Sequence, residues 1–276
     1  MSDLSPFLDA DLVSGSLYQD QQRLADRTGA LMAAKISGRP APGVIASYAL
    51  RARPRPGSLV LDIGCGRGAS TLALTRTLPA SRILAIDASH AMLAATRDRL
   101  TQAGGAVTTM QADFHHLPLD TGSASLAVAA FCLYHAPDPR VVLREMARCL
   151  HPGATVILVT KAADSYASLD RLVARARLDP NATSRTGLYG AFHSANMRAI
   201  AENVLDVREV HHETHRFWFR DLAHTAAYLA TTPKYQLPDG LTGDPEALNH
   251  RLRAVLPDEP VETASVVSYL TATVPG

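Results

Sequence analysis

A glycine-rich turn lies between an apolar run and a helical pattern, in the segment DIGCGRG that begins at Asp62. Glycine is needed in such a turn because the backbone bends tightly and a ligand must approach it closely. Gly64, Gly66 and Ala69 also satisfy the GxGxxG/A pattern of dinucleotide binding, so the loop by itself is compatible with NAD. The flanking strand and helix patterns favour a ligand-binding loop over a merely tight turn.

Two carboxylates narrow the choice of ligand. Asp62 lies two residues before Gly64, where it would repel a pyrophosphate but attract an ammonium group. Asp87 ends the next predicted strand, where a carboxylate can accept hydrogen bonds from both hydroxyls of a ribose. The alternative role for Asp87 is the N-cap of the following helix, a position that Ser89 can also fill. The pair favours a cofactor with a cationic amino-acid end and no phosphate.

The elements that would position these groups alternate between strand and helix. Near-continuous apolar strands that alternate with helices indicate a parallel sheet covered on both faces. The strands are expected near residues 58–63, 82–87, 106–113, 125–135 and 154–160, and the helices near 16–36, 44–52, 69–78, 91–103 and 139–150.

The pattern changes after Lys161. Four further helices are expected near residues 166–178, 193–204, 221–232 and 245–256, together with strands at 206–219 and 261–274. These two late strands are expected to pair antiparallel at the edge of the earlier sheet. The predicted organisation is an N-terminal helical lid in residues 1–40, and one domain in residues 41–276 with a helical substrate cap at about 162–250.

Composition excludes several classes of protein. The chain has 276 residues, 47% of them hydrophobic and 19% charged, with a net charge of +1. Such a chain is too apolar to be disordered and lacks the basic surplus of a dedicated nucleic-acid binder. Three scattered cysteines make neither a disulfide framework nor a tetrahedral zinc site. No apolar run reaches 18 residues and the N-terminus does not resemble a signal peptide, so a cytoplasmic protein without membrane association is expected.

Five blocks in order carry a resemblance to a known family: DIGCGRG, AIDAS, QADFHHLPL, ASLAVAAFCLYHAPDP and LREMARCLHPGATVILV. They resemble class I S-adenosylmethionine-dependent methyltransferases, in particular the small-molecule enzymes related to ubiquinone and menaquinone biosynthesis. The resemblance covers roughly residues 44 to 161. It implies an α/β fold with a Rossmann-like, doubly wound, seven-stranded sheet that is mostly parallel and has an antiparallel edge strand.

The resemblance also implies the cofactor, S-adenosylmethionine, with S-adenosylhomocysteine as product, and the residues that bind it. Each of these positions matches a cofactor-contacting position of the family. They are Tyr18 as a lid over the cofactor, Asp62, Gly64, Cys65, Gly66 and Gly68 around the methionine part, Asp87 at the ribose, Ala88 and Met92 at the adenine face, Asp113 and Phe114 at the adenine edge, and Phe131 beside the methyl group.

Candidates for chemistry lie after the fourth predicted parallel strand. His135 is placed to act as a general base, since a neutral imidazole titrates near working pH, or it is a structural histidine. Tyr134 beside it could orient the substrate or simply pack. His193 falls in the predicted cap, where it could contact the substrate.

The remaining histidines do not predict a metal site. His115 and His116 lack a third ligand at suitable spacing. On the predicted strand 206–219, His211 and His215 share one face and His212 lies on the other. The HRFWFR segment mixes basic and aromatic residues, but a strand facing the core or a small-molecule pocket explains it without nucleic acid.

The leading hypothesis is methyl transfer to a small-molecule, natural-product acceptor, by a monomer or homodimer with or without a partner subunit. The alternative is a methyltransferase fold that catalyses a cyclisation, elimination or hydrolysis without methyl transfer. A non-catalytic partner subunit is a third hypothesis, although it would be expected to have lost Asp62 or Asp87. A nicotinamide enzyme comes last, because the later sequence blocks do not fit one.

Overall fold

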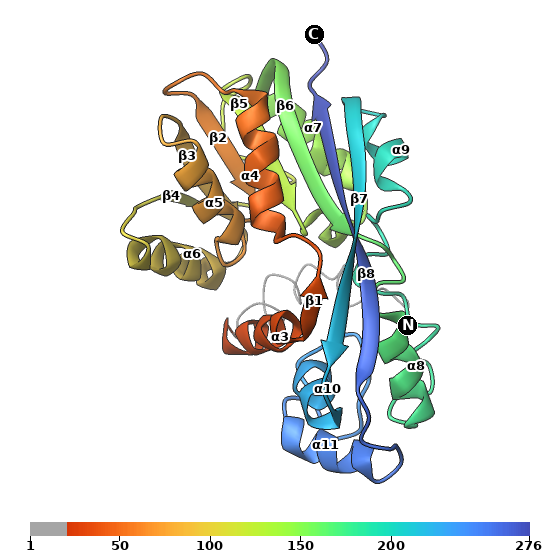
Figure 1. Ribbon diagram of the computed structural model, residues 1–276. Coiled ribbons are helices and arrows are strands. Elements are labelled where there is room, and N and C mark those ends of the chain that lie inside the picture. Colours follow the sequence, from red (N-terminus) through yellow and green to blue (C-terminus); the bar gives the residue numbers. More distant parts are fainter. Residues whose placement is uncertain (1–20) are drawn as a thin grey trace.

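A single eight-stranded sheet forms the centre of the molecule, in the order β1-β7-β8-β6-β5-β2-β3-β4 (Figure 1). The computed structural model describes residues 21–276, and the side chains from residue 25 onward. The strands are β1 (Lys35–Ser37), β2 (Leu59–Ile63), β3 (Arg82–Asp87), β4 (Thr108–Gln111), β5 (Ala124–Ala130), β6 (Leu150–Lys161), β7 (Asp206–Phe219) and β8 (Val261–Thr273).

Strands β2 to β6 pair in parallel, whereas β8 pairs antiparallel with both β6 and β7. This arrangement confirms the predicted fold class and the predicted antiparallel edge. In the parallel part, the strand order reverses between β2 and β5. An open α/β sheet binds its ligand outside the carboxyl ends of the strands at such a point.

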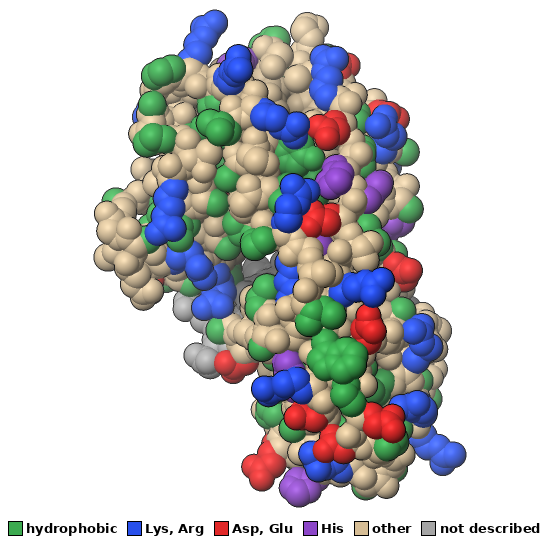
Figure 2. Space-filling view, in the orientation of Figure 1, with side chains coloured by type: hydrophobic (Ala, Val, Ile, Leu, Met, Phe, Trp, Pro, Cys, Tyr) green, Lys and Arg blue, Asp and Glu red, His purple; other side chains and the backbone are tan. Residues whose placement is uncertain are grey.

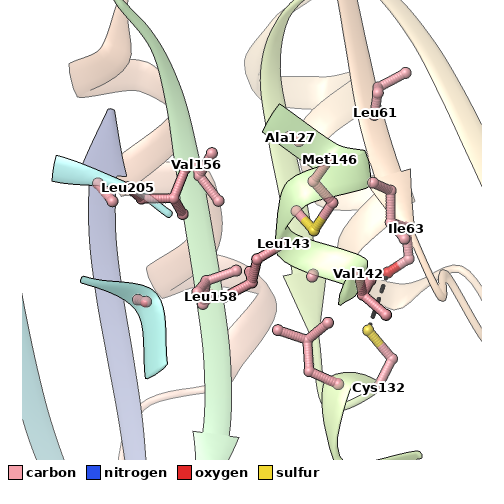
Figure 3. Packing of buried hydrophobic residues seen from close by; sticks show 14 of the residues in the cluster. Leu61, Ile63, Ala127, Cys132, Val142, Leu143, Met146, Val156, Leu158 and Leu205 are labelled. Atoms are coloured by element: carbon pink, nitrogen blue, oxygen red, sulfur yellow. Dashed lines mark hydrogen bonds between the residues drawn. The ribbon is translucent and has the colours of Figure 1, made fainter. Parts of the chain in front are cut away.

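Helices cover both faces of the parallel part (Figure 1). They are α4 (Ala41–Ala52), α5 (Ala69–Thr77), α6 (His90–Gln102), α7 (Pro139–Cys149) and the short α9 (Met197–Ala201), with a single 3-10 turn η1 (Leu133–His135) after β5. On one face, Leu143 and Met146 of α7 pack on the fully buried Leu158 of β6 and on its neighbours (Figure 3). Tyr48 of α4 and Leu74 of α5 belong to the core of the opposite face. Two apolar layers therefore hold the sheet and fix where its strand ends lie.

Strands β7 and β8 extend well past the parallel strands and carry a second lobe (Figure 1). Four helices surround this extension: α3 (Gln21–Ala34), α8 (Ala167–Arg175), α10 (Leu222–Leu229) and α11 (Pro245–Arg253). They share a separate core that contains the fully buried Phe219, Leu229 and Leu248. Because this lobe is built on the two longest strands of the sheet, it lies beyond the carboxyl ends of the parallel strands.

Several predicted boundaries were wrong. The strand predicted at 125–135 ends at Ala130, because Phe131 leaves the extended conformation with φ of 57°, and residues 133–135 form the 3-10 turn η1. The pattern at 16–36 predicted one helix, but α3 ends at Ala34 and residues 35–37 form β1, an eighth strand that pairs with β7. The helix predicted at 193–204 is shorter in the structure: α9 covers Met197–Ala201, and a turn in which the Asn196 side chain accepts a hydrogen bond from His193 N–H (2.7 Å) precedes it. Tyr18 and the rest of residues 1–20 lie outside the described residues.

Charged side chains of both signs are interspersed on the face seen in Figure 2. Within residues 21–276, no helix is long and apolar enough to span a bilayer.

Candidate functional site

The turn after β2 gathers glycines with left-handed backbone at the carboxyl edge of the sheet. Gly64, Gly66 and Gly68 have φ of 64°, 54° and 73°. Glycine adopts these angles without the steric cost that a side chain would bring. The N–H of Gly68, which is the N-cap of α5, donates to the carbonyl of Cys65 (3.0 Å) and tightens the turn.

Only one of these three glycines has room beside it. A Cβ added to Gly64 would lie 2.5 Å from Cβ of Cys132, and one added to Gly68 would lie 2.9 Å from Thr96. A Cβ at Gly66 would meet nothing within 4 Å. Gly64 and Gly68 are therefore required by packing, whereas the backbone at Gly66 borders open space that a ligand can fill.

Asp62 is fully buried directly beneath this turn. Its carboxylate accepts hydrogen bonds from Thr71 Oγ1 (2.6 Å) and from Ser70 Oγ (3.1 and 3.3 Å), both at the start of α5. Burial raises the pKa of Asp62 from 3.8 to about 6, although the two hydroxyls oppose this shift. A buried carboxylate whose partners are neutral carries a charge that a nearby cation would stabilise.

Asp87, at the end of β3, is hydrogen-bonded to the glycine turn that follows β2. Its Oδ2 accepts from the N–H of Gly66 and its Oδ1 from the N–H of Ser89, each at 2.9 Å. Burial is the largest influence on Asp87 and raises its pKa. The cap of α6 is supplied by Ser89, whose Oγ accepts from Met92 N–H (3.4 Å). Asp87 is therefore not needed as a cap, and it lies where β3 ends beside the turn.

Residues after β3 and β4 border the same edge. Ala88 is exposed, Met92 is buried in α6, and the Ala88 carbonyl accepts from Gln111 Nε2 (3.0 Å). The exposed Asp113 accepts from both the backbone N–H (2.9 Å) and Nδ1 (2.7 Å) of His115. Burial acts to raise the pKa of Asp113, but the hydrogen bonds from His115 outweigh it and hold the pKa below its ordinary value. Phe114 meets the His115 ring edge-on, with ring centroids 4.7 Å apart.

The end of β5 holds a bulky residue in an unusual conformation. Phe131 has φ of 57°, and its N–H donates to the Val159 carbonyl (2.9 Å). The left-handed backbone conformation is strained for an aromatic residue, and such strain concentrates at functional sites. The next residue, Cys132, packs against Gly64. Its Sγ donates to the carbonyl of Ile63 (3.3 Å; Figure 3). The turn after β2 and the end of β5 are therefore in direct contact.

The candidate residues for chemistry have different surroundings. Tyr134 in η1 is buried against Tyr189, edge to face, with centroids 4.9 Å apart. The half-buried His135 follows it, with its ring 4.6 Å from that of Tyr134. His193 is also half-buried; burial lowers its pKa, and its Nδ1 accepts from Ala195 N–H (3.2 Å). The nitrogen of His193 that remains available is therefore Nε2.

The histidines of β7 divide between its two faces as the alternation predicts. His211 Nε2 lies 3.2 Å from Arg39 and its ring stacks on Tyr269, whereas His212 bonds Ser268 on the other face (2.7 Å). His215 packs against Gly38, and burial lowers its pKa to about 4. Among the described residues, no group of three or more His, Cys, Asp or Glu side chains could hold a metal ion.

Several residues of the site were not predicted from the sequence. Ser70 and Thr71 hold Asp62, while Thr96 donates to the Gly66 carbonyl (2.8 Å) and Arg99 to that of Arg67 (2.7 Å). The two hydroxyls directly follow the glycine turn, so their place in the sequence could have indicated them. Thr96 and Arg99 lie about thirty positions downstream, on the outer helix α6, and only the fold brings them to the turn.

The central part of the chain matches a known family. The family described as "Methyltransferase domain" matches residues 61–158. A ubiquinone/menaquinone biosynthesis C-methyltransferase, UbiE, from Idiomarina loihiensis is 34% identical over 121 residues, which are 43% of this chain and 48% of that protein. The chain spans only 30 to 66% of the length of the curated relatives it matches.

Solved structures are similar over more of the chain. A candidate methyltransferase from Bacillus halodurans has a TM-score of 0.59 at 16% identity, covering 84% of this chain and 99% of that one. The (4+2)-cyclase SpnF has a TM-score of 0.61 at 16% identity, covering 96% of both chains. These likenesses show that the overall fold is shared over most of the chain.

Proposed function

We propose that this chain, which carries a class I S-adenosylmethionine-dependent methyltransferase domain, transfers the methyl group of that cofactor to a small-molecule acceptor. The single observation that carries the proposal is the turn after β2. Three features lie together there, at the carboxyl edge of the sheet: open space beside Gly66, the buried carboxylate of Asp62, and the carboxylate of Asp87, which could accept hydrogen bonds from a ribose.

The residues present fit the cofactor. Open space at Gly66 lets a ligand approach the backbone, and Asp62 would stabilise the ammonium of the methionine part. Because Asp62 is fully buried behind Ser70 and Thr71, we expect it to act through a bound water or through its field. Asp87 would accept the ribose hydroxyls, and the exposed Asp113 the adenine amino group. When bound, S-adenosylmethionine supplies an electrophilic methyl carbon on a sulfonium.

On the acceptor side, the chain's part is to position the nucleophile, exclude water and take up a proton where the nucleophile carries one. Phe131 would border the methyl group, and His135 would be the base for a protonated nucleophile. Tyr134 is buried against Tyr189, which favours a packing role that keeps His135 in place. His193 would contact the acceptor through Nε2. Lid residues 1–40, including Tyr18, and the cap within 162–250 would enclose the acceptor, and Cys65, buried in the turn, contributes packing.

The affinity for the cofactor is expected to rise about tenfold between pH 5 and pH 7. The pKa of Asp62 is about 6 in the free protein, and the cofactor's ammonium favours the ionised form. Calorimetric titration across this range is the measurement. Asp62→Asn should bind more weakly and lose most of this pH dependence; an equally steep dependence in the variant would show that Asp62 does not face the ammonium.

The same raised pKa affects stability in the free protein. A carboxyl group whose pKa is higher in the folded state contributes stability that is fully present below its unfolded pKa of 3.8, and that is lost as the pH rises through about 6. A shift of this size corresponds to about 3 kcal/mol. Asp62→Asn should therefore reduce the decline in unfolding free energy between pH 4 and pH 7.

The proposed reaction is tested with S-adenosylmethionine that carries a trideuteromethyl group. Mass spectrometry should find an acceptor that gains one labelled methyl group, with one S-adenosylhomocysteine formed per product. A second candidate function is cyclisation without methyl transfer, which the whole-chain likeness to SpnF favours. In that case an acceptor would be converted at unchanged mass while the labelled cofactor stayed intact.

A reducing cytoplasm remains the proposed setting, since all three cysteines are buried free thiols. The proposed partner is a small molecule, and neither a nucleic acid nor a membrane is part of the proposal.

A further inference from the structure

A lysine at the carboxyl end of β6 points into a group of aromatic rings. Lys161 Nζ donates to Tyr166 Oη at 2.6 Å. It lies 5.0, 5.5 and 5.7 Å from the ring centroids of Tyr166, Phe131 and Tyr189. These rings come from the start of the second lobe, the end of β5 and the segment before α9. The ammonium is therefore held where the sheet edge meets both peripheral segments.

The charge of Lys161 has no counter-ion in the part of the chain that the structure describes. No carboxylate there lies within 4.0 Å of Nζ. Glu213 on β7, an acidic group near this region, is already paired with Arg39 (2.8 Å), and Lys35 on β1 adds a further positive charge. An ammonium has three donors; Tyr166 accepts from one of them, and the Tyr189 hydroxyl also hydrogen-bonds to the lysine. A half-buried cation that lies near other positive charges and has a donor to spare is suited to bind an anion.

Contacts connect this cation to the proposed methyl-transfer site. Phe131 touches the lysine with its ring, and its left-handed backbone is fixed by the hydrogen bond to Val159 on β6. The adjacent Cys132 packs directly on Gly64 of the glycine turn. Lys161 is therefore linked to the turn that would hold the cofactor through two adjacent residues, Phe131 and Cys132.

We infer that Lys161 binds the acceptor through an oxygen anion, so that the acceptor is a small planar acid: a carboxylic acid, or a phenol or enol acidic enough to ionise near neutral pH. This inference rests on the proposed function and names the substrate class of the same site. The rings of Phe131, Tyr166 and Tyr189 provide flat apolar faces for the body of such a molecule.

The transfer step balances with this acceptor. The acceptor's proton leaves to water when the anion forms. The bond between its oxygen and the methyl carbon then forms as the methyl–sulfur bond breaks, and the electron pair of that bond stays on sulfur. The sulfonium cation and the oxygen anion become a neutral thioether and a neutral ester or ether, so no oxidant or reductant is needed.

Matched pairs of probes test the inference without turnover. Benzoate is compared with methyl benzoate, and 4-nitrophenol with 4-nitroanisole, by ligand-observed NMR on the full chain with S-adenosylhomocysteine present. In the wild type, at least one acid should bind more than about tenfold tighter than its neutral partner. In Lys161→Met, which keeps the length and apolar packing of the side chain, this preference should fall to within about twofold. Lys161→Arg should retain it. The benzoate and nitrophenol arms distinguish a carboxylate acceptor from a phenolate one.

Two results would overturn the inference: no acid preference in the wild type, or an undiminished preference in Lys161→Met. If Lys161→Met does not fold, Lys161→Gln takes its place, with the melting temperature as the check. S-adenosylhomocysteine affinity is recorded in parallel and should be unchanged in the variants. If the wild-type protein does not bind S-adenosylhomocysteine, that result counts against the proposed function alone. The preference for acids over their neutral partners is then measured on the protein without S-adenosylhomocysteine.

Discussion

Gly66→Ala is expected to weaken S-adenosylmethionine binding by about 30-fold or more while the protein stays folded. The added Cβ would meet nothing in the free protein, so it would occupy the space assigned to the cofactor. A difference of about 2 kcal/mol in binding free energy corresponds to this factor. Calorimetry gives the affinity, and thermal melting gives the stability.

A matched control separates steric blocking from backbone strain. Gly104, after α6, also has positive φ (76°) and open space around its would-be Cβ. Gly66→Ala and Gly104→Ala should each cost about 1–2 kcal/mol of stability. Only the first should affect cofactor binding. Equal affinity in Gly66→Ala and the wild type would show that the open space beside the turn is not where the cofactor binds.

Asp87→Ala should weaken cofactor binding by about 10- to 150-fold, the equivalent of roughly 1.5–3 kcal/mol for a lost charge-assisted acceptor. The structure adds a second consequence, because the N–H groups of Gly66 and Ser89 both lose their acceptor. The melting temperature should therefore fall as well.

Two further variants separate the effect of Asp87 on cofactor binding from its effect on stability. Asp87→Asn retains one acceptor oxygen and should recover part of the stability, but it should still bind the cofactor weakly because it carries no charge. Asp98→Ala, on the exposed side of α6, removes an equal charge and should change neither quantity. If Asp87→Ala bound the cofactor as tightly as the wild type, Asp87 would only stabilise the turn through its hydrogen bonds to Gly66 and Ser89.

The turn that we propose binds the cofactor could be predicted from the sequence because its residues are close together in the chain. Asp62 and the three glycines of the turn are consecutive with the strand and helix that position them. Asp87 ends a strand that pairs in register with β2, so its place followed from the alternation of elements. The alternation along 206–219 likewise identified the bounds of β7, although the register shifts between Val207 and Glu209.

The group around Lys161, which we propose binds the acceptor, could not be predicted, because segments far apart in the sequence build it. Lys161 meets rings from positions 131, 166 and 189, and no sequence spacing encodes that meeting. Strand β1 was missed for a similar reason. Its three residues follow a helical pattern without a break, and they pair with a strand about 180 positions away.

Calorimetric titration of the wild-type protein near pH 7 shows whether the turn between β2 and α5 binds S-adenosylmethionine. We expect heat at one site per chain with a dissociation constant in the micromolar range, on the order of −8 kcal/mol, and a rise in melting temperature. Neither heat nor a melting shift at saturating cofactor, from a protein that is folded, would mean that the turn does not bind it.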